Sequence, residues 1–360
     1  MAVVHGARLE FFSGNGFVDL VSRRSITENT VFRIASITKT FSAISVMQRA
    51  ERGLTDLDAH AADYLRAYSL VSADPSFRPA TVRHLLTHTA GIGETAHPAK
   101  VLRPDFGESV PPGEPIPALS DYYRGGLRIQ AEPGTRWTYS NHRFATLGQI
   151  VADVSGIPLT QYPRAKVFEP LGMTDTDLAP VVRRATGYTL RGSGPRAVAD
   201  REMVTAGAAS VYSTPRDMAR YLAALLGGAN EFGVVLESDT LATMFEAQYQ
   251  PDPRIPGMGL AFFVASRVAI GSSNTRASLP GFDSQIWLAP DDGLGIFACT
   301  NGAHRAMLWL PAEVSEMMND LLGACGNPIR ADVAHHPEIW PDICGHYRLP
   351  GPSPIFAPVP

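Results

Sequence analysis

The sequence predicts an α+β fold in which an antiparallel sheet is flanked by helices. Residues 2–20 alternate apolar and polar side chains in the manner of two short strands. Apolar residues then recur at helical spacing in several stretches between residues 31 and 156. After residue 258, short apolar runs separated by Gly, Pro, Asn and Asp are typical of successive antiparallel strands. Because two strands alone are only marginally stable, we expect these later strands to pair with the opening hairpin.

Residues 31–53 predict a long amphipathic helix early in the chain. One apolar stripe runs along it and consists of Ile37, Phe41, Ile44 and Met47. Such a stripe buries a helix against a core, and Gly53 is placed to end it. The first turn also carries Ser36 and Lys39, which lie three residues apart and therefore share one face.

Ser36 and Lys39 are interpreted as a nucleophile and its base. A serine hydroxyl attacks poorly at neutral pH unless a base takes its proton, and a lysine can do so only where its pKa is lowered. The start of a helix supplies the positive potential that lowers it. Only three of the 31 Lys and Arg residues are lysines, so a lysine at this position indicates a cation that must lose its proton. The alternative is a solvated lysine on the helix surface.

Composition excludes several classes of function. With 360 residues, 45% of them hydrophobic, the chain can bury one large core or two smaller ones. A formal charge of −4 leaves no basic surface for nucleic acid, and no run of 18 uncharged apolar residues predicts a membrane span. The N-terminus lacks the pattern of a secretory signal, so we expect a cytoplasmic protein, or a secreted one if the N-terminus is truncated.

Neither histidines nor cysteines predict a metal site. His84 and His88 lie four residues apart on a short helix expected within residues 81–92, but no Glu between them completes a zinc motif, so a structural role is favoured. The cysteines are too scattered for a disulfide framework and are interpreted as buried free thiols: Cys299, Cys325 and Cys344. We expect no metal and no cofactor.

The middle of the chain is expected to combine helices with a long loop. Residues 94–135 are too rich in proline for regular structure throughout. Long loops often form walls of substrate sites, so Tyr122 and Tyr123 are candidates to line a pocket, with surface loop as the alternative. Further helices are expected in the second half of residues 136–156 and at 214–228 and 307–324.

The order of these elements predicts two domains and a tail. Residues 1–55 and 200–330 are expected to form the sheet domain, and residues 56–199 a mainly helical domain inserted after the first helix. Residues 331–360 are a proline-rich tail, expected to be extended or disordered.

Six motifs, in order and at similar spacing, resemble those of the serine β-lactamase-like hydrolases. They are SITK (36–39), HLLTHTAGI (84–92), PGTRWTYSN (133–141), FEPLGMTDT (168–176), AGAASVYSTPRDMARYL (206–222) and LPGFDSQIWLAPDDGLGIFACTN (279–301). The branch most similar to this chain contains class C β-lactamases, carboxylesterases and D-aminopeptidases. Ser-x-x-Lys is the nucleophile motif of penicillin-recognising enzymes. The resemblance implies a β-lactamase/transpeptidase-like fold over roughly residues 2–325.

The resemblance also assigns roles to particular residues. Ser36 corresponds to the acylated nucleophile and Lys39 to its activating partner. Tyr139 corresponds to a phenolate-like base or proton shuttle, and Asn141 to a residue that bonds the acyl side of the substrate or holds Lys39. Ser278 is expected to complete the oxyanion hole together with the Ser36 N–H. From the residues alone, residues 139–141 also fit a helix N-cap, because Ser140 or Asn141 directly precedes a helix.

Two features depart from the family pattern. Where the family has Lys or His, then any residue, then Gly, this chain has Thr275, Arg276 and Ala277. Ala277 is expected to narrow the cleft, and Arg276 is a candidate substrate-binding residue that supplies a displaced cation. The helix that usually precedes the first strand is missing, and residues 342–349 resemble the opening of an accessory β domain, so we expect both ends to be truncated.

The leading functional hypothesis is a hydrolase of small carboxylic esters, or of amides, that acts through an acyl-serine. A second hypothesis is a β-lactamase, D-Ala-type peptidase or D-aminopeptidase, and Thr275 argues against recognition of its carboxylate. A third is a catalytically impaired binding protein, motivated by the altered residues 275–277. The expected partner is a small-molecule ester or amide, and the oligomeric state is left open.

Overall fold

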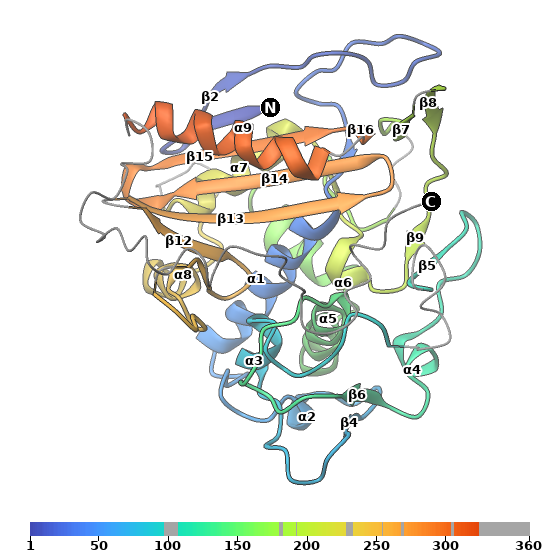
Figure 1. Cartoon of the computed structure of the whole chain (residues 1–360), viewed down its shortest axis with the longest axis vertical. Coiled ribbons are helices and arrows are strands. Elements are labelled where there is room, and N and C mark those ends of the chain that lie inside the picture. Colours follow the sequence, from blue (N-terminus) through green and yellow to red (C-terminus); the bar gives the residue numbers. More distant parts are fainter. Residues whose placement is uncertain are drawn as a thin grey trace, which may run out of the picture. The chain divides into compact units, whose positions relative to one another are not determined.

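A seven-stranded antiparallel sheet lies at the centre of the fold (Figure 1). Its strand order is β11-β12-β13-β14-β15-β1-β2. The strands are β1 (Ala2–His5), β2 (Arg8–Phe12), β11 (Gly257–Met258), β12 (Phe263–Arg267), β13 (Ile270–Leu279), β14 (Phe282–Ala289) and β15 (Leu294–Thr300). The hairpin β1–β2 pairs with β15, with Val3 opposite Ile296. The expected pairing of the first and last strands is therefore confirmed.

The computed structural model describes most of the chain. The described residues are 1–96, 107–179, 183–191, 193–227, 233–253, 255–267, 270–303 and 306–323. Backbone contacts group Met1–Met318 as one unit and separate Asn319–Pro360 from it. The expected division of the first unit into a sheet domain and a helical domain stays a prediction, and the expected tail at 331–360 lies outside the described residues.

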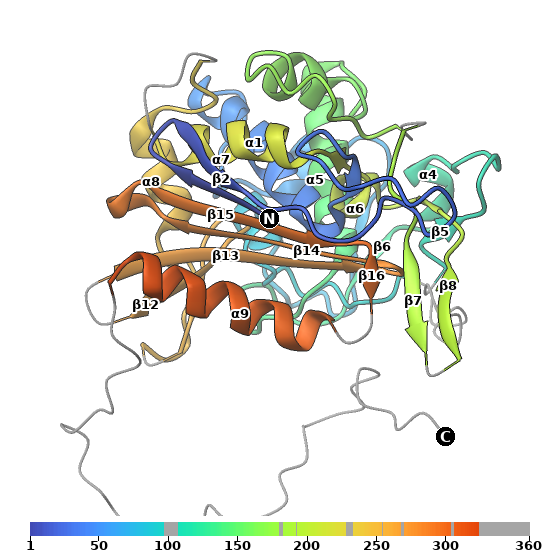
Figure 2. The ribbon, with the colours of Figure 1, turned by 90° about the horizontal axis from the view of Figure 1, so that it is seen from above.

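Helices cover both faces of the sheet, which confirms the α+β class. The helices are α1 (Thr38–Glu51), α2 (Ala61–Tyr64), α3 (Val82–Leu86), α4 (Leu119–Tyr122), α5 (Asn141–Ser155), α6 (Ala206–Ala209), α7 (Pro215–Leu225), α8 (Ser238–Phe245) and α9 (Ala306–Leu321), with 3-10 turns η1 (Ala35–Ile37) and η4 (Pro290–Asp292) and the π-helix η3 (Arg164–Phe168). Within Met1–Met318, α1 and α7 lie on one face of the sheet and α9 on the other (Figure 2).

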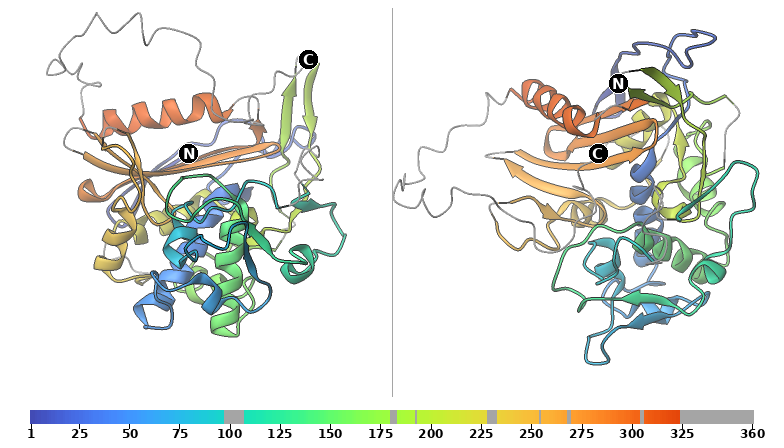
Figure 3. Two further views of the ribbon diagram at one scale, coloured as in Figure 1. Left: turned by 60° about the horizontal axis from the view of Figure 1, so that its bottom comes forward. Right: turned by 45° about the vertical axis from the view of Figure 1, so that its right-hand side comes forward.

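Short strands form small sheets around the central one. The pairs are β3 (Phe32–Arg33) with β10 (Tyr212–Ser213), β4 (Leu70–Ser72) with β6 (Leu127–Ile129), β5 (Ser109–Val110) with β9 (Glu202–Met203), and β7 (Tyr188–Arg191) with β8 (Gly194–Ala197) and β16 (Gly302–Ala303). The β7–β8 hairpin stands at one end of the central sheet (Figure 3). The strands of these small sheets are too short for a sequence pattern to predict them.

The helix expected at 31–53 is present, but it begins later than its pattern indicated. Ser36 lies in the 3-10 turn η1, and α1 begins at Thr38. Gly53 follows its end at φ +67°, as expected. Every residue from Thr38 to Gln48 is buried, so α1 is a central helix rather than one with a single buried stripe.

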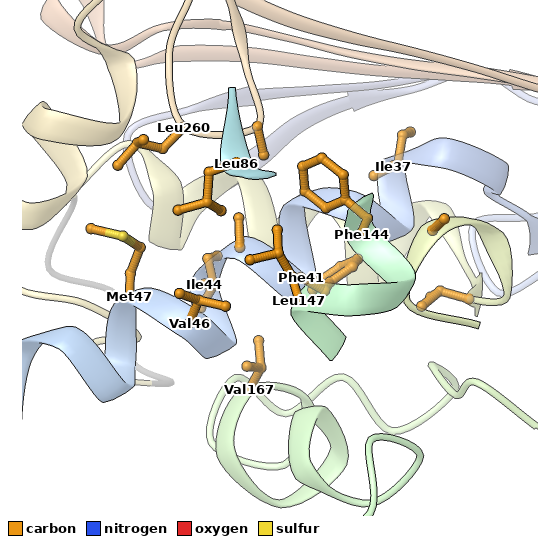
Figure 4. Packing of buried hydrophobic residues seen from close by; sticks show 14 of the residues in the cluster. Ile37, Phe41, Ile44, Val46, Met47, Leu86, Phe144, Leu147, Val167 and Leu260 are labelled. Atoms are coloured by element: carbon orange, nitrogen blue, oxygen red, sulfur yellow. The ribbon is translucent and has the colours of Figure 1, made fainter. Parts of the chain in front are cut away.

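The apolar stripe of α1 contacts side chains from several other elements (Figure 4). The labelled residues around it include Leu86 of α3, Phe144 and Leu147 of α5, Val167 of η3 and Leu260. The Phe41 ring lies 4.1 Å from that of Tyr221 and 5.2 Å from that of Phe168, measured between ring centroids. This packing fixes α1, and with it the turn that carries Ser36, against α5 and α7.

The expectation for Tyr122 and Tyr123 was wrong. Both side chains are buried in the core, and the Tyr123 hydroxyl lies 2.9 Å from Nδ1 of His142. The proline-rich stretch also contains short regular elements, namely α4, β5 and β6. Proline restricts these elements to a few residues without preventing the loop from contributing aromatic side chains to the core.

Two further expectations concern cysteines and membrane spans. Cys299 is a free cysteine and is partly buried, whereas Cys325 and Cys344 lie outside the described residues. Within the part of the chain that the structure describes, the helices are too short or too polar to cross a membrane.

Candidate active site

Ser36 lies in a turn whose backbone is held in an unusual conformation. Ala35 has φ +45°, in the left-handed region that residues other than glycine seldom adopt. The Thr38 hydroxyl donates to the Ala35 carbonyl at 2.6 Å and accepts from the Val211 N–H at 3.0 Å. Strained backbone of this kind persists only where the surrounding structure enforces it, and it is frequent at active sites.

Ser36, Lys39, Tyr139 and Asn141 meet in one hydrogen-bonded group. Lys39 Nζ donates to Ser36 Oγ at 2.9 Å, to Asn141 Oδ1 at 2.8 Å and to the Ala208 carbonyl at 3.1 Å. The Tyr139 hydroxyl lies 2.7 Å from Ser36 Oγ on the other side. The sequence therefore identified four residues that the fold brings together from η1, α1 and the start of α5. Two groups that can hold or release a proton contact the serine oxygen.

Burial allows Lys39 to lose its proton near neutral pH. Its side chain is buried, with 2% of the residue exposed, and this burial lowers its pKa to about 7. The negative charge of Glu108 acts in the opposite direction and keeps the pKa from falling further. Near pH 7 a large fraction of Lys39 is therefore a neutral amine, which can accept the hydroxyl proton of Ser36.

Tyr139 is a phenol rather than a phenolate. Burial raises its pKa above the ordinary value, although the hydrogen bond with Ser36 acts in the opposite direction. His88 lies against its ring with 4.8 Å between centroids, and burial holds the pKa of His88 well below its usual value. The phenolate role expected for Tyr139 is therefore disfavoured, and the role of proton shuttle fits its state.

Asn141 holds Lys39 and connects it to a buried carboxylate. Its Oδ1 accepts from Lys39, and its Nδ2 donates to Glu108 Oε2 at 2.8 Å. The same oxygen of Glu108 accepts from the Thr205 hydroxyl at 3.2 Å, while Oε1 lies 3.5 Å from His142 Nε2. Sequence analysis missed Glu108, because it lies in the proline-rich stretch and no motif or periodicity distinguishes it there.

The side chain of Ser140 does not cap α5. Ser140 is the N-cap residue, but its hydroxyl donates to the Gly93 carbonyl at 2.7 Å instead of accepting from the helix. Asn141 is the first residue of the helix, and its amide is used by Lys39 and Glu108. The side chains of Ser140 and Asn141 therefore do not cap the helix, contrary to the alternative interpretation of this motif.

The residues around the third motif are placed by backbone register alone. Thr275, Arg276 and Ala277 lie on β13 opposite Ile286, Gln285 and Ser284 of β14, and Ser278 lies opposite Asp283. The side chains of Arg276 and Ser278 lie outside the described part of the structure. The strand itself lies next to η1, so it runs beside the turn that carries Ser36.

The two histidines of the second motif have structural partners. Nδ1 of His84 accepts from the Thr81 N–H at 3.2 Å and completes a capping box at the start of α3. His88 packs on Tyr139, as described above. Among the described residues, no group of three or more His, Cys, Asp and Glu side chains is placed to hold a metal ion.

The chain is similar to proteins of a known family. The family model described as Beta-lactamase matches residues 1–312. Penicillin-binding protein PbpX of Bacillus subtilis (strain 168) is 25% identical over 78% of this chain, and the matched region spans 64% of PbpX, less than two thirds of its length. Esterase EstB of Burkholderia gladioli is 27% identical over 84% of this chain and 85% of EstB.

The fold is also shared with solved structures. A beta-lactamase/D-alanine carboxypeptidase from Yersinia pestis has a TM-score of 0.72 at 20% identity, over 89% of this chain and 92% of that one. The β-lactamase/transpeptidase-like fold expected from the motifs is confirmed by this likeness. By the extent of the family match, the chain belongs to the beta-lactamase family.

Proposed function

We propose that this protein is a serine hydrolase that cleaves small carboxylic esters through an acyl-serine intermediate. The observation that carries the proposal is the pair of contacts to one oxygen: Ser36 Oγ lies 2.9 Å from Lys39 Nζ and 2.7 Å from the Tyr139 hydroxyl. A nucleophile within hydrogen-bond reach of a base that is itself held by a third group is the signature of nucleophilic catalysis. Asn141 is that third group.

Acylation follows from the states of these groups. Neutral Lys39 takes the proton of Ser36 as the serine oxygen attacks the ester carbonyl, so Lys39 becomes an ammonium and the carbonyl oxygen an oxyanion. The N–H groups of Ser36 and Ser278 are the proposed donors to that oxyanion. When the C–O bond of the ester breaks, Tyr139 gives its proton to the leaving oxygen, and Lys39 replaces that proton.

Deacylation runs through the same groups in the reverse order. Water attacks the acyl-serine, and its proton passes through Tyr139 to Lys39, which is again neutral after the first half-reaction. Collapse of the second tetrahedral intermediate releases the acid and returns a proton from Lys39 to Ser36. The enzyme needs no external proton store, because the three groups end each cycle as they began it.

Labelling with a fluorophosphonate probe tests the acyl-serine directly. We expect mass spectrometry of the digested protein to place the probe on the peptide that contains Ser36, because only an activated serine reacts readily with such a probe. A protein that binds ligands without catalysis leaves the probe unreacted. Failure to label Ser36 in folded protein would overturn the proposal.

The substrate class is tested by comparing an ester with a cephalosporin. A β-lactam presents a carboxylate that the family normally meets with a cation on β13, where this chain has Thr275. Loss of such a charge-assisted hydrogen bond costs about 1.5–3 kcal/mol, or roughly 10–150-fold in discrimination. We expect measurable kcat/KM for a short p-nitrophenyl ester and weak or absent turnover of a chromogenic cephalosporin. A kcat/KM for the cephalosporin equal to or above that for the ester would favour the β-lactamase hypothesis. Arg276→Ala would then test whether Arg276 binds the carboxylate of the cephalosporin.

The buried carboxylate of Glu108 is expected to set the pH dependence. Lys39 acts as a base when neutral, so kcat/KM rises with pH through the pKa of Lys39, which lies near 7. Glu108 raises that pKa, and Glu108→Gln removes the charge while keeping an oxygen that can accept from Asn141. We therefore expect the acid-side rise of the pH–rate profile to move to lower pH.

The control for this prediction is Glu10→Gln, an exposed substitution on β2 that should leave the profile unchanged. A profile of Glu108→Gln that moves to higher pH, or does not move, would show that Lys39 is not the titrating base.

Amide hydrolysis and D-Ala-type peptidase activity remain alternatives to ester hydrolysis within the same family. The expected cytoplasmic location stays a prediction from the sequence.

A further inference from the structure

A large cavity lies beside the Ser36 group and has no role in the chemistry described so far. It has a volume of about 880 Å³ and borders the site through Asn141 and Glu108. This volume falls in the range of pockets that hold a small ligand, about 300–1,000 Å³. Its walls come from segments near β5, β9 and the β7–β8 hairpin, which gather on one side of Met1–Met318 in Figure 1.

The cavity has a charged wall with more positive than negative groups. Three guanidinium groups, Arg33, Arg184 and Arg201, line it together with two carboxylates among the described residues, Glu108 and Asp200. They come from separate parts of the chain and converge there through the fold. Because arginine stays charged at any pH of interest, the three guanidinium groups remain cationic.

The carboxylate of Asp200 is already fully engaged. Its Oδ1 accepts from Arg33 Nη1 at 2.6 Å, and its Oδ2 pairs with Arg184 Nε and accepts from the Tyr212 hydroxyl at 3.1 Å. One carboxylate thus serves two guanidinium groups. Glu202 also interacts electrostatically with both arginines, so a bound anion would have to be held by the guanidinium N–H groups that neither carboxylate uses.

Arg33 has donor capacity that its neighbours do not use. The residue is 4% exposed and lies on β3, three positions before Ser36. Nη1 donates to Asp200 and to the Arg201 carbonyl, but Nε and Nη2 have no hydrogen-bond partner among the described residues. A buried guanidinium with unbonded N–H groups is costly unless a ligand or water accepts from them.

We propose that this cavity binds a carboxylate carried by the substrate, so that the preferred esters are anionic. This inference rests on the proposed ester hydrolase. The arginines meet the carboxylate, and the apolar wall formed by Met203, Leu279 and Phe282 contacts the hydrocarbon part of the same molecule. None of these arginines comes from β13, so the carboxylate is recognised at a different place from that of a β-lactam.

The carboxylate can belong to the acyl part or to the leaving group, and two pairs of substrates distinguish these sources. For the acyl part, the mono-p-nitrophenyl ester of adipic acid is compared with the neutral p-nitrophenyl methyl diester. For the leaving group, 4-carboxyphenyl butyrate is compared with its neutral methyl ester. Each kcat/KM is divided by the rate of hydroxide hydrolysis of the same ester, which removes differences in intrinsic reactivity.

We expect the anionic member of one pair to exceed its neutral partner by about tenfold or more, the usual scale of a charge-assisted hydrogen bond. The pair that shows the preference identifies the side of the ester that enters the cavity. Equal values within both pairs would overturn this inference and leave the ester hydrolase standing. Absence of turnover with all four esters, without labelling of Ser36, would overturn the proposed function and this inference with it.

Variants of the arginines test the location of the site. Arg184→Gln and Arg33→Gln should each lower the ratio of anionic to neutral kcat/KM by about tenfold. Arg196→Gln, an exposed substitution on β8 outside the cavity wall, should leave the ratio unchanged. Arg33 is buried, so if its variant does not fold, Arg184→Gln decides, because its side chain is 28% exposed. An unchanged ratio in Arg184→Gln would overturn the assignment.

Discussion

Ser36→Ala abolishes ester turnover and labelling by a fluorophosphonate, if Ser36 is the nucleophile. Lys39 Nζ and the Tyr139 hydroxyl both contact Ser36 Oγ, so its removal leaves the base without the nucleophile that it activates. We expect kcat to fall by roughly 10⁴-fold or more, to the residual level that binding and an oxyanion hole alone provide. Steady-state assay with a p-nitrophenyl ester measures the fall, and mass spectrometry measures the loss of label.

The control is Ser76→Ala, which removes an exposed hydroxyl that donates to Asp74, two residues before it. It should keep the wild-type rate and the label on Ser36. A Ser36→Ala protein that retains more than a few per cent of the wild-type kcat would show that the reaction does not pass through this serine. Circular dichroism of the variant confirms that it is folded.

Lys39→Ala lowers kcat/KM by roughly 10²–10⁴-fold, the usual scale for a positioned base. Lys39→Arg should fail almost as badly, because arginine retains the charge but does not release its proton. That comparison separates the base role from a purely electrostatic one, since an electrostatic role would survive in Lys39→Arg. The measurement is kcat/KM for a p-nitrophenyl ester across the pH range.

The matched control for the lysine is Lys166→Ala, which removes an exposed side chain of η3. Its rate should equal that of the wild type. If Lys39→Ala keeps most of the wild-type rate on an activated ester, then the scheme in which Lys39 activates Ser36 is wrong. A kcat/KM of Lys39→Arg close to that of the wild type would show that a positive charge at this position suffices.

Local pattern and short family motifs were enough to identify the central group of the site. Ser36 and Lys39 lie three residues apart, which predicted that their side chains would face the same way. Tyr139 and Asn141 were identified by the resemblance of residues 133–141 to a motif of the family. The short apolar runs after residue 258, separated by Gly, Pro, Asn and Asp, likewise predicted the strands of the sheet. In each case the information lies within a few neighbouring residues.

Errors in the sequence-based predictions occurred where burial depends on distant segments. Tyr122 and Tyr123, which were expected to line a pocket or to lie on a surface loop, are instead buried, and both rings contact His142 of α5. The start of α1 was misplaced by the 3-10 turn η1, which Thr38 and Val211 stabilise through a contact between separate elements. A local window contains neither of these partners.

The sequence by itself determined the family, the α+β class and the Ser36, Lys39, Tyr139 and Asn141 set. Only the tertiary structure decided that Lys39 is buried enough to have a pKa of about 7, that the charge of Glu108 opposes this shift, and that three arginines line one cavity. The physical reason is that a pKa, and the set of charged side chains around a cavity, depend on distances through space. Chain folding sets those distances between residues that are far apart in sequence, and no spacing along the chain encodes them.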